Sequence, residues 1–546
     1  VTLAAGVDLF TIKDTESAIP STLNGGPGND TLIVEDSSGV VTVYGGDGLD
    51  YITFINAGGV TTLNGDNSDD NVNTNPPPSC DPLLTTCPGD DRFYIQKADG
   101  NLTVNGGVGA DKYFVSNTVS PTTFTVGGVY DDSDPLSLMS GDLSTVTGTL
   151  YINGNADGNG GYKDRLFIYP GATTTNGLLN NAKLTGLTMA GSGAIQYGTG
   201  EELHLRLGAA GDIFTIYGVP TGTTVTVNGS DGDDVVNVGN AAGLLNEIDG
   251  SVIFHGDAGS DRLNAHNEGD TADCTADPDL IWACGQLTAI ALSGLGMGSS
   301  SLSEWHIFHA IQNPDKSIST STEQVHVYLG SGDDKFFVDS TYAYGTGYVH
   351  AGDGDDTIRV ESTAYGLNPA SMRRVDFIAG PVYLDGEDGN DFVILNDMGD
   401  DIVNSGTFEN GAVTGLGITG SVRFTDTSEQ LEVDLGAQND SFYVRTTPSW
   451  LTTRIKMGEG FDTTYVGSGS NSLDDILGPL YIEGELPYAD DVLFVNDYGD
   501  SSDNTYTISS ENIGVIEVPD PNNPIQTIEL PVNETTIQRT GAAVIK

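Results

Sequence analysis

Basic residues are scarce in this chain of 546 residues, which holds 20 Lys and Arg against 77 Asp and Glu, a net charge of −57. Proteins that bind nucleic acids or anionic lipid recognise phosphate groups with Lys and Arg. The deficit therefore argues against both as main partners. Two explanations of the acidity remain open: an array that binds cations, or a surface adapted to salty water.

Long apolar runs and cysteine are also scarce. No segment approaches the ~18 consecutive apolar residues of a membrane-spanning helix, and there are 4 Cys. These form two local pairs, Cys80 with Cys87 and Cys274 with Cys284, in stretches that interrupt the repeat described below. Neither pair has the spacing of a zinc site, so we predict two disulfides that close loops in an oxidising, extracellular or cell-surface setting. The sequence starts at Val1 without Met or a signal-peptide pattern, which indicates a processed chain or a segment of a larger one.

Glycine and small turn residues are abundant. The chain has 73 Gly and 37% apolar residues, so it can bury a core while turning often. Acceptor sequons for N-glycosylation occur at Asn29, Asn101, Asn228, Asn439 and Asn533.

A spacing pattern organises the chain into a repeat. Five times an Asp is followed at +2 by Phe and at +4 by Ile or Val, and 20 or 22 residues later by a second Asp with Val at +4. The Asp pairs are Asp8 and Asp30, Asp91 and Asp111, Asp212 and Asp234, Asp334 and Asp356, and Asp440 and Asp462. A repeat of this kind decides both the fold class and the kind of function to expect.

The residues around each Asp predict a turn followed by a strand. A typical copy reads Gly229-Ser230-Asp231-Gly232-Asp233-Asp234, and apolar residues then alternate with polar ones. Glycine permits positive φ and close backbone approach, and the alternation indicates a strand with one buried face. A step of 20 to 22 residues is about the length of one coil of a β-solenoid.

Stacked coils would place equivalent Asp residues in a column ~4.8 Å apart, where like charges repel unless they are neutralised. Ca²⁺ takes six to eight oxygen ligands at flexible angles, so we expect several calcium sites at these turns. The predicted ligands are Asp30, Asp50, Asp111, Asp234, Asp261, Asp334, Asp356 and Asp391.

The turns resemble the RTX (hemolysin-type) calcium-binding repeats, whose consensus is G-G-x-G-x-D-x-U-x. Copies such as Gly25-Gly26-Pro27-Gly28-Asn29-Asp30 and Gly386-Glu387-Asp388-Gly389-Asn390-Asp391 carry the resemblance. It implies loops that bind Ca²⁺ between short parallel strands stacked as a β-roll. This chain departs from the family because its copies recur every twenty or so residues instead of in immediate tandem, and several copies lack a glycine.

We therefore predict an all-β protein, a parallel β-solenoid (β-helix or β-roll-like) with loop inserts; tandem β-sandwich domains are the alternative. About 25 coils would form a rod on the order of 120 Å long. The expected units are residues 1–82, 83–200, 201–323, 324–430 and 431–546, the last with a C-terminal extension from Pro519. Inserts are expected near 72–90, 131–149, 266–325 and 362–380. In the longest of these, His306 and His309 are more consistent with packed or loop histidines than with metal ligands.

The pattern favours a structural function. Acidic residues occupy turns, basic residues do not gather with them, and no nucleophile–base arrangement stands out, so we expect no enzymatic activity. The favoured interpretation is an extracellular rod, a subunit or segment of a surface filament, appendage or layer, stabilised by calcium. The alternative is a calcium-dependent adhesin or glycan-binding surface protein. Expected partners are copies of the chain, other surface proteins and glycans, with no nucleic acid and no membrane insertion.

Overall fold

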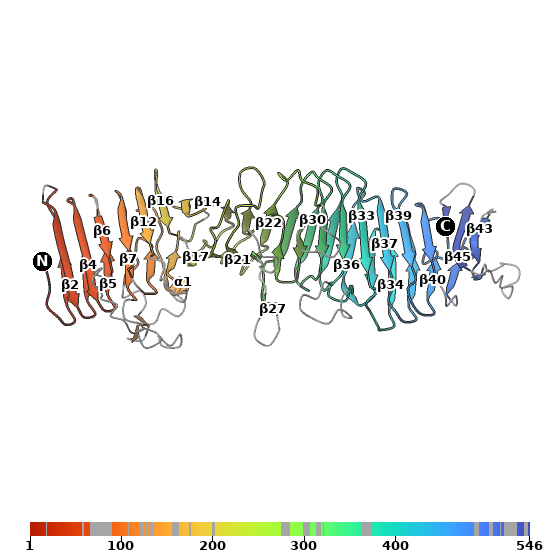
Figure 1. The fold of residues 1–546 in the computed structure, drawn as a ribbon, viewed down its shortest axis with the longest axis horizontal. Helices are drawn as coiled ribbons and strands as arrows, with labels where there is room; N and C mark the ends of the chain where they lie inside the picture. Colours follow the sequence, from red (N-terminus) through yellow and green to blue (C-terminus); the bar gives the residue numbers. More distant parts are fainter. Residues whose placement is uncertain are drawn as a thin grey trace.

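The computed structural model describes most of the chain. The described residues are 1–17, 19–56, 59, 61–65, 90–107, 109–120, 125–126, 129–130, 135–154, 163–173, 176–198, 202–274, 284–298, 306–312, 318–319, 322–362, 373–484, 491–501, 506–513, 515–517, 532–539 and 544–545. The protein is nearly all-β, with 45% of its residues in strands and 1% in helices. Figure 1 shows an elongated molecule in which the strands follow one another from the N-terminal to the C-terminal end.

The chain alternates between two long sheets, and most neighbouring strands within each sheet are parallel. The first sheet contains, in spatial order, β1 (Leu9–Ile12), β3 (Thr31–Val34), β5 (Tyr51–Phe54), β7 (Arg92–Ile95), β9 (Lys112–Val115), β13 (Arg165–Ile168), β17 (Glu202–Arg206), β19 (Thr224–Asn228), β21 (Ser251–His255), β25 (Ile307–Phe308), β24 (Ala291–Ser293), β23 (Gln286–Leu287), β29 (Lys335–Val338), β31 (Thr357–Val360), β33 (Phe392–Asn396), β37 (Gln430–Asp434), β39 (Thr452–Lys456) and β41 (Leu480–Glu483). The second contains β2 (Ser21–Pro27), β4 (Val41–Asp47), β6 (Thr61–Asn64), β8 (Leu102–Asn105), β12 (Thr149–Asn153), β16 (Ala194–Tyr197), β15 (Lys183–Gly186), β14 (Asn176–Asn180), β18 (Ile213–Ile216), β20 (Val235–Val238), β22 (Arg262–His266), β28 (Gln324–Tyr328), β30 (Thr346–His350), β32 (Pro381–Asp385), β36 (Ile418–Phe424), β35 (Ala412–Gly415), β34 (Ser405–Glu409), β38 (Ser441–Val444), β40 (Thr463–Val466), β42 (Val492–Val495) and β44 (Val515–Glu517).

The remaining elements are short or lie at the C-terminal end. Strands β10 (Thr125–Val126) and β11 (Val129–Tyr130) form one antiparallel pair, and β26 (Ile311–Gln312) and β27 (Ile318–Ser319) form another. At the end of the first sheet β46 (Val544–Ile545) pairs with β41, and β45 (Val532–Arg539) joins it to β43 (Tyr506–Ile513). The C-terminal extension from Pro519 lies largely outside the described residues.

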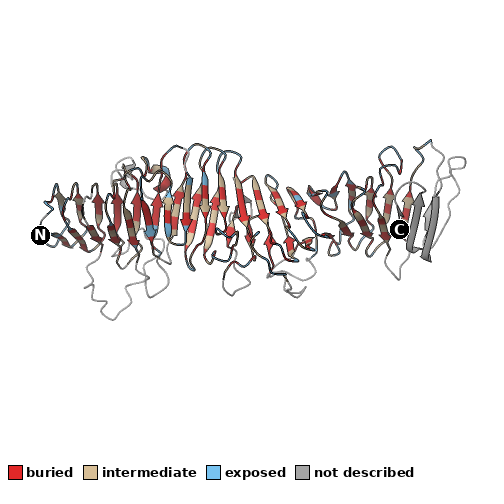
Figure 2. Ribbon diagram, turned by 90° about the horizontal axis from the view of Figure 1, so that it is seen from above, coloured by how far each residue is buried: buried red, intermediate tan, exposed pale blue. Residues whose placement is uncertain are grey.

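One apolar core fills the space between the sheets along the rod. The predicted alternation holds: in β20, for example, Val236 and Val238 are fully buried whereas Val235 and Asn237 are partly exposed. The apolar residues at +2 and +4 from each Asp point inward, and Phe214, Phe336 and Phe442 have no exposed surface. In Figure 2 buried residues follow the strands and exposed ones gather at the connecting loops. Long continuous sheets of this kind are consistent with a β-solenoid and do not end at the expected unit boundaries.

Three antiparallel meanders interrupt the simple alternation. Strands β14, β15 and β16 occupy three neighbouring places in the second sheet, β23 to β25 do so in the first, and β34 to β36 again in the second. Each meander is followed by one strand of the two long sheets (β17, β28 or β37) before the next Asp-anchored strand, so the Asp-anchored strands change sheet. They belong to the first sheet up to β13, to the second from β18 to β22, to the first from β29 to β33, and to the second from β38 to β42.

The meanders end shortly before the expected boundaries at 200/201, 323/324 and 430/431, whereas described strands on either side of 82/83 stay in simple alternation. The unit boundaries themselves stay predictions. The insert near 131–149 contains the short helix α1 (Pro135–Leu138), which the sequence did not suggest. Leu136 and Met139 there cover Phe114 and Phe167 on the outer face of the first sheet. Within the described part of the chain, no helix has the length and hydrophobicity needed to cross a bilayer.

Candidate functional site

The repeated Asp residues are linked to one another directly through ladders of hydrogen bonds. In all five pairs found in the sequence, the backbone N–H of the first Asp donates to Oδ1 of the second, as from Asp212 to Asp234 at 2.7 Å. The bonds continue beyond the pairs and form four ladders, one for each set of Asp-anchored strands. These are Asp8–Asp30–Asp50–Asp91–Asp111–Asp164, Asp212–Asp234–Asp261–Glu323, Asp334–Asp356–Asp391–Glu429 and Asn404–Asp440–Asp462–Asp491.

Two ladders end on glutamates that the sequence analysis did not single out. Glu323 Oε2 accepts from the N–H of Asp261 at 2.7 Å, and Glu429 Oε2 accepts from the N–H of Asp391 at 2.8 Å. Each precedes a strand that follows a meander, β28 or β37. Each glutamate occupies the position directly before a strand, where most other ladder members have Asp. An acidic residue directly before an alternating strand is therefore the sequence signal that could have identified them.

A second, exposed ladder runs beside the buried one in the opposite direction. The residue before the buried Asp accepts a hydrogen bond from the next coil; for example, Asp233 Oδ1 accepts from the N–H of Ser260 at 2.9 Å. The same bond joins Asn29 to Leu49, Asp90 to Ala110, Asp333 to Asp355, Asp355 to Asn390 and Asn439 to Phe461. The side-chain oxygens of both ladders accept hydrogen bonds from backbone N–H groups in the turns. These groups lie beyond the ends of the strands, outside the hydrogen bonding of the sheets.

The inner carboxyl groups are buried. Asp234 and Asp462 have no exposed surface and Asp356 has 1%, and in each the second oxygen, Oδ2, has no hydrogen-bond partner among the described residues. Burial raises the pKa of Asp234 and Asp356 to about 7 and that of Asp462 to about 8, and the neighbouring ladder carboxylates add to the shift. The same causes raise the pKa of Asp261 and Asp391 to about 6. These five inner ladder residues therefore favour the protonated, neutral carboxylic acid up to near-neutral pH.

The eight predicted calcium ligands all lie in these ladders. Seven are buried, and Asp334 is partly exposed. Each of the seven buried ligands accepts a hydrogen bond from a backbone N–H through one carboxylate oxygen. The structure therefore gives these residues a role that needs no ion. Oδ2 and a backbone carbonyl nevertheless both lie beside a turn glycine: Asp234 Oδ2 and the Gly256 oxygen lie 2.4 and 2.5 Å from the point where a Cβ on Gly229 would be. Calcium at these turns stays a prediction.

Two other groups bring three ligand side chains together, each with its ligand atoms within 4.8 Å of one another. One is His350, Asp385 and Glu387; the other is Asp376, Asp397 and Asp400. The sequence analysis predicted none of these six residues as a metal ligand. Both groups join residues from different coils.

In the second group Asp397 is fully buried, and its Oδ1 accepts from the N–H of Val375 at 3.1 Å. Burial, together with the charges of Asp400 and Asp376, raises the pKa of Asp397 to about 8. Arg374 lies beside the group, with Nη1 3.4 Å from Asp400 Oδ1, and partly neutralises it. A cation bound there would compete with this guanidinium.

The other predicted features have mixed outcomes. His306 and His309 are packed, as expected: both are buried, with Nδ1 of His306 3.1 Å from the Gly250 oxygen and Nε2 of His309 3.0 Å from the Thr288 oxygen. Burial lowers the pKa of His309 to about 4. Cys274 and Cys284 form a disulfide with a Cα–Cα distance of 5.6 Å, within the usual range. Cys80 and Cys87 lie outside the described residues.

Comparison of the sequence with protein-family models gives no match, and comparison with curated proteins gives no relative. The functional argument therefore rests on the geometry of this chain.

Proposed function

We propose that the chain is an extracellular structural rod, a subunit or segment of a surface filament, appendage or layer. The observation that supports this most is the continuity of the two sheets, which run from β1 to β42 through all the repeat units over one apolar core. Each coil is fixed to its neighbours by two sets of strand hydrogen bonds and by the ladder bonds at the turns. Such cross-linking of consecutive coils suits a molecule that must keep its length and direction.

The first coil supports association along the rod axis. Strand β1 pairs with β3 on one side, and Val7, Leu9 and Ile19 are 80%, 73% and 59% exposed on this coil. A strand edge next to apolar side chains favours pairing with another strand. In the proposed filament that strand comes from a neighbouring segment or from a second copy of the chain.

Calcium stabilisation is part of the proposal and is best supported at Asp376, Asp397 and Asp400. Three carboxylates converge there, and Asp397 Oδ2 is a fully buried oxygen without a hydrogen-bond partner in the described part of the chain. Ca²⁺ prefers such oxygen ligands. Asp397→Asn should abolish most of any calcium-induced rise in melting temperature if this is the main site. Asp401→Asn is the matched control, because Asp401 is 76% exposed beside the group and pairs with Arg374.

Sedimentation velocity and electron microscopy of the purified chain, at increasing concentration with calcium and with chelator, test the rod and its assembly. We expect the frictional ratio of an elongated particle in both solutions and end-to-end oligomers at high concentration. A compact particle would contradict the rod, and monomers at every concentration would contradict self-assembly.

A specific surface feature supports glycan binding as the second candidate function. On the outer face of the second sheet the rings of His326, Tyr348 and Tyr383 stack in a row, with centroids 4.1 and 5.0 Å apart, and Arg423 lies over Tyr383. Outward aromatic rings suit contact with sugars. A glycan array probed with and without calcium tests this function: binding that Tyr383→Ala abolishes supports it, and the lack of any binding refutes it.

A further inference from the structure

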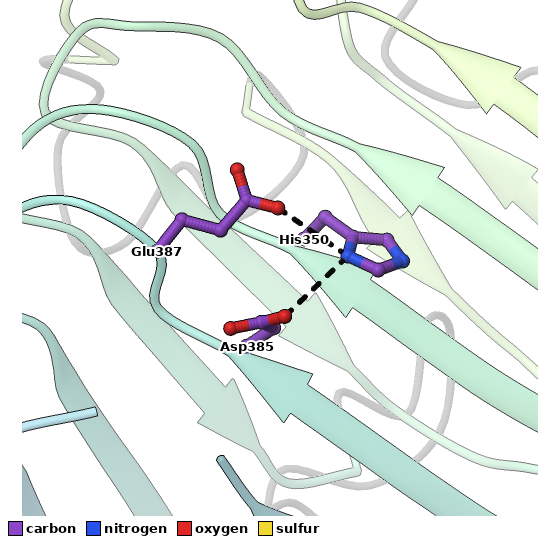
Figure 3. Close-up of side chains that lie close together, drawn as sticks. All are labelled: His350, Asp385 and Glu387. Atoms are coloured by element: carbon purple, nitrogen blue, oxygen red, sulfur yellow. Dashed lines mark ion pairs between the residues drawn. The ribbon is translucent and has the colours of Figure 1, made fainter. Parts of the chain in front are cut away.

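Three potential metal ligands converge on the outer face of the second sheet (Figure 3). His350 is the last residue of β30, Asp385 is the last residue of β32 in the next coil, and Glu387 lies in the turn after β32. His350 Nδ1 lies 3.8 Å from Asp385 Oδ2 and 3.4 Å from Glu387 Oε1. The same ring nitrogen thus faces both carboxylates.

Asp385 is held in place by two hydroxyl groups. Its Oδ1 accepts hydrogen bonds from Thr425 Oγ1 at 2.9 Å and from Thr427 Oγ1 at 2.6 Å. These bonds use one carboxylate oxygen and leave Oδ2 on the side of His350. Hydrogen bonds that orient a ligand in this way are typical of the surroundings of protein metal sites.

His350 has a matching partner on its other ring nitrogen. His350 Nε2 lies 3.3 Å from His326 Nδ1. In the tautomer in which His326 Nδ1 accepts this hydrogen bond, His350 Nε2 carries the proton. With the proton of His350 on Nε2, its Nδ1 presents a lone pair to the space between the two carboxylates.

The residues at both carboxylate positions vary along the repeat. Glu387 has a φ of 64°; the equivalent turn position is glycine at Gly26, Gly46, Gly107 and Gly352, and a residue with a Cβ and positive φ also occurs there at Ser230 and Asp257. A residue with a Cβ is strained in this region, so glycine at 387 would relieve that strain. The position before the turn is also changed. In the first two units it carries Asn64, Asn105 and Asn153, joined amide to amide at 2.8 Å.

We propose that His350, Asp385 and Glu387 bind a Zn²⁺ ion, with water completing the coordination. Zinc bonds of ~2.0–2.2 Å to nitrogen and oxygen in a tetrahedron separate the ligand atoms by ~3.3 Å. The Nδ1–Oε1 distance of 3.4 Å already matches this, and the Nδ1–Oδ2 distance of 3.8 Å needs only a small closure. The Glu387 side chain is 45% exposed and free to adjust. An imidazole ligand favours zinc over calcium, which prefers oxygen donors.

Bound zinc would join two consecutive coils at their outer face. The site shares the turn before Asp391 with a predicted calcium site, because Glu387 lies in that turn, but none of its three ligands is a member of a buried ladder. It does not depend on the proposed structural function. It would add a cross-link to β30 and β32.

Calorimetric titration of the metal-free full chain with ZnCl₂, checked by competition with a chromophoric chelator, tests the proposal. We expect one zinc ion whose affinity falls at least tenfold in His350→Ala and in Glu387→Gln. Thr427→Ala should lower it ~10-fold through the loss of orientation. His204→Ala is the matched control, since His204 also faces a glutamate on an outer sheet face, with Nε2 3.5 Å from Glu202 Oε2. It should leave this affinity unchanged.

Glu387→Gly separates metal binding from a structural role. Glycine relieves the positive φ, so this variant should be at least as stable as the wild type without zinc while losing zinc affinity. A purely structural Glu387 would instead lose stability and leave zinc affinity unaltered. The proposal is overturned if folded metal-free protein takes up no zinc, or if His350→Ala and Glu387→Gln bind it as tightly as the wild type.

Discussion

Replacing one inner ladder carboxyl group by an amide should stabilise the protein at alkaline pH. Asp234→Asn keeps the oxygen that accepts the N–H of Asp212. It also places an NH₂ group at the position of Asp234 Oδ2, which lies beside Gly229, as does the carbonyl oxygen of Gly256. An amide can donate to this carbonyl, whereas an ionised carboxylate cannot.

The magnitude follows from the pKa of Asp234, which burial raises to about 7 from an ordinary value of ~3.9. The folded state therefore binds a proton more tightly than the unfolded chain, and the free energy of unfolding decreases as the pH rises from ~4 through 7. Three pKa units correspond to an upper limit of ~4 kcal/mol at pH 8. The neighbouring residues Asp233 and Ser260 are exposed, so solvent screening reduces this limit, and we expect a gain of ~1–2 kcal/mol from the substitution.

Urea unfolding followed by circular dichroism at pH 5 and pH 8, in chelator, measures this effect. We expect the variant to exceed the wild type at pH 8 and to exceed it by much less at pH 5, where most of the pH-dependent loss has not yet occurred. Asp233→Asn is the control: Asp233 is exposed and makes the equivalent bond to Ser260, so its stability should change by less than ~0.5 kcal/mol. Lower stability of Asp234→Asn than of the wild type at pH 8 would refute the reasoning. The same measurement repeated with calcium tests the predicted calcium turn. Stabilisation of the wild type but not of Asp234→Asn by calcium would support it.

Three further predictions concern packing and covalent links. Gly229→Ala should destabilise the protein by ~1–3 kcal/mol in thermal unfolding, since the new Cβ would lie 2.4 Å from Asp234 Oδ2; an unchanged melting temperature would show that the turn yields easily. Phe214→Ala should reduce the free energy of unfolding by ~3–5 kcal/mol, because Phe214 is fully buried, whereas Phe461→Ala should have little effect because Phe461 is 55% exposed; equal losses would contradict the core assignment. Reduction of Cys274–Cys284, which closes a loop with a sequence separation of 10, should destabilise that insert by ~2–3 kcal/mol, and amide exchange confined to other coils would disprove this local role.

The sequence by itself determined the repeat, the alternation of buried and exposed residues and the turn before each Asp-anchored strand. These features are local: glycine permits the turn, and apolar residues at +2 and +4 from the Asp define the buried face within one strand. The five Asp pairs found by spacing are also the pairs that bond directly, because the simple coils between them have a nearly constant length of 20 or 22 residues.

Only the tertiary structure decided what the carboxyl groups contact. One ladder reaches from Asp111 to Asp164 across 53 residues, and two others end on Glu323 and Glu429, because inserts and meanders change the length of a coil without changing its neighbours in space. His350 and Asp385 likewise meet because β30 and β32 pair in register over an intervening strand and insert. Spacing along the chain identifies which residues repeat, but contact between coils depends on sheet register, which long-range strand pairing sets.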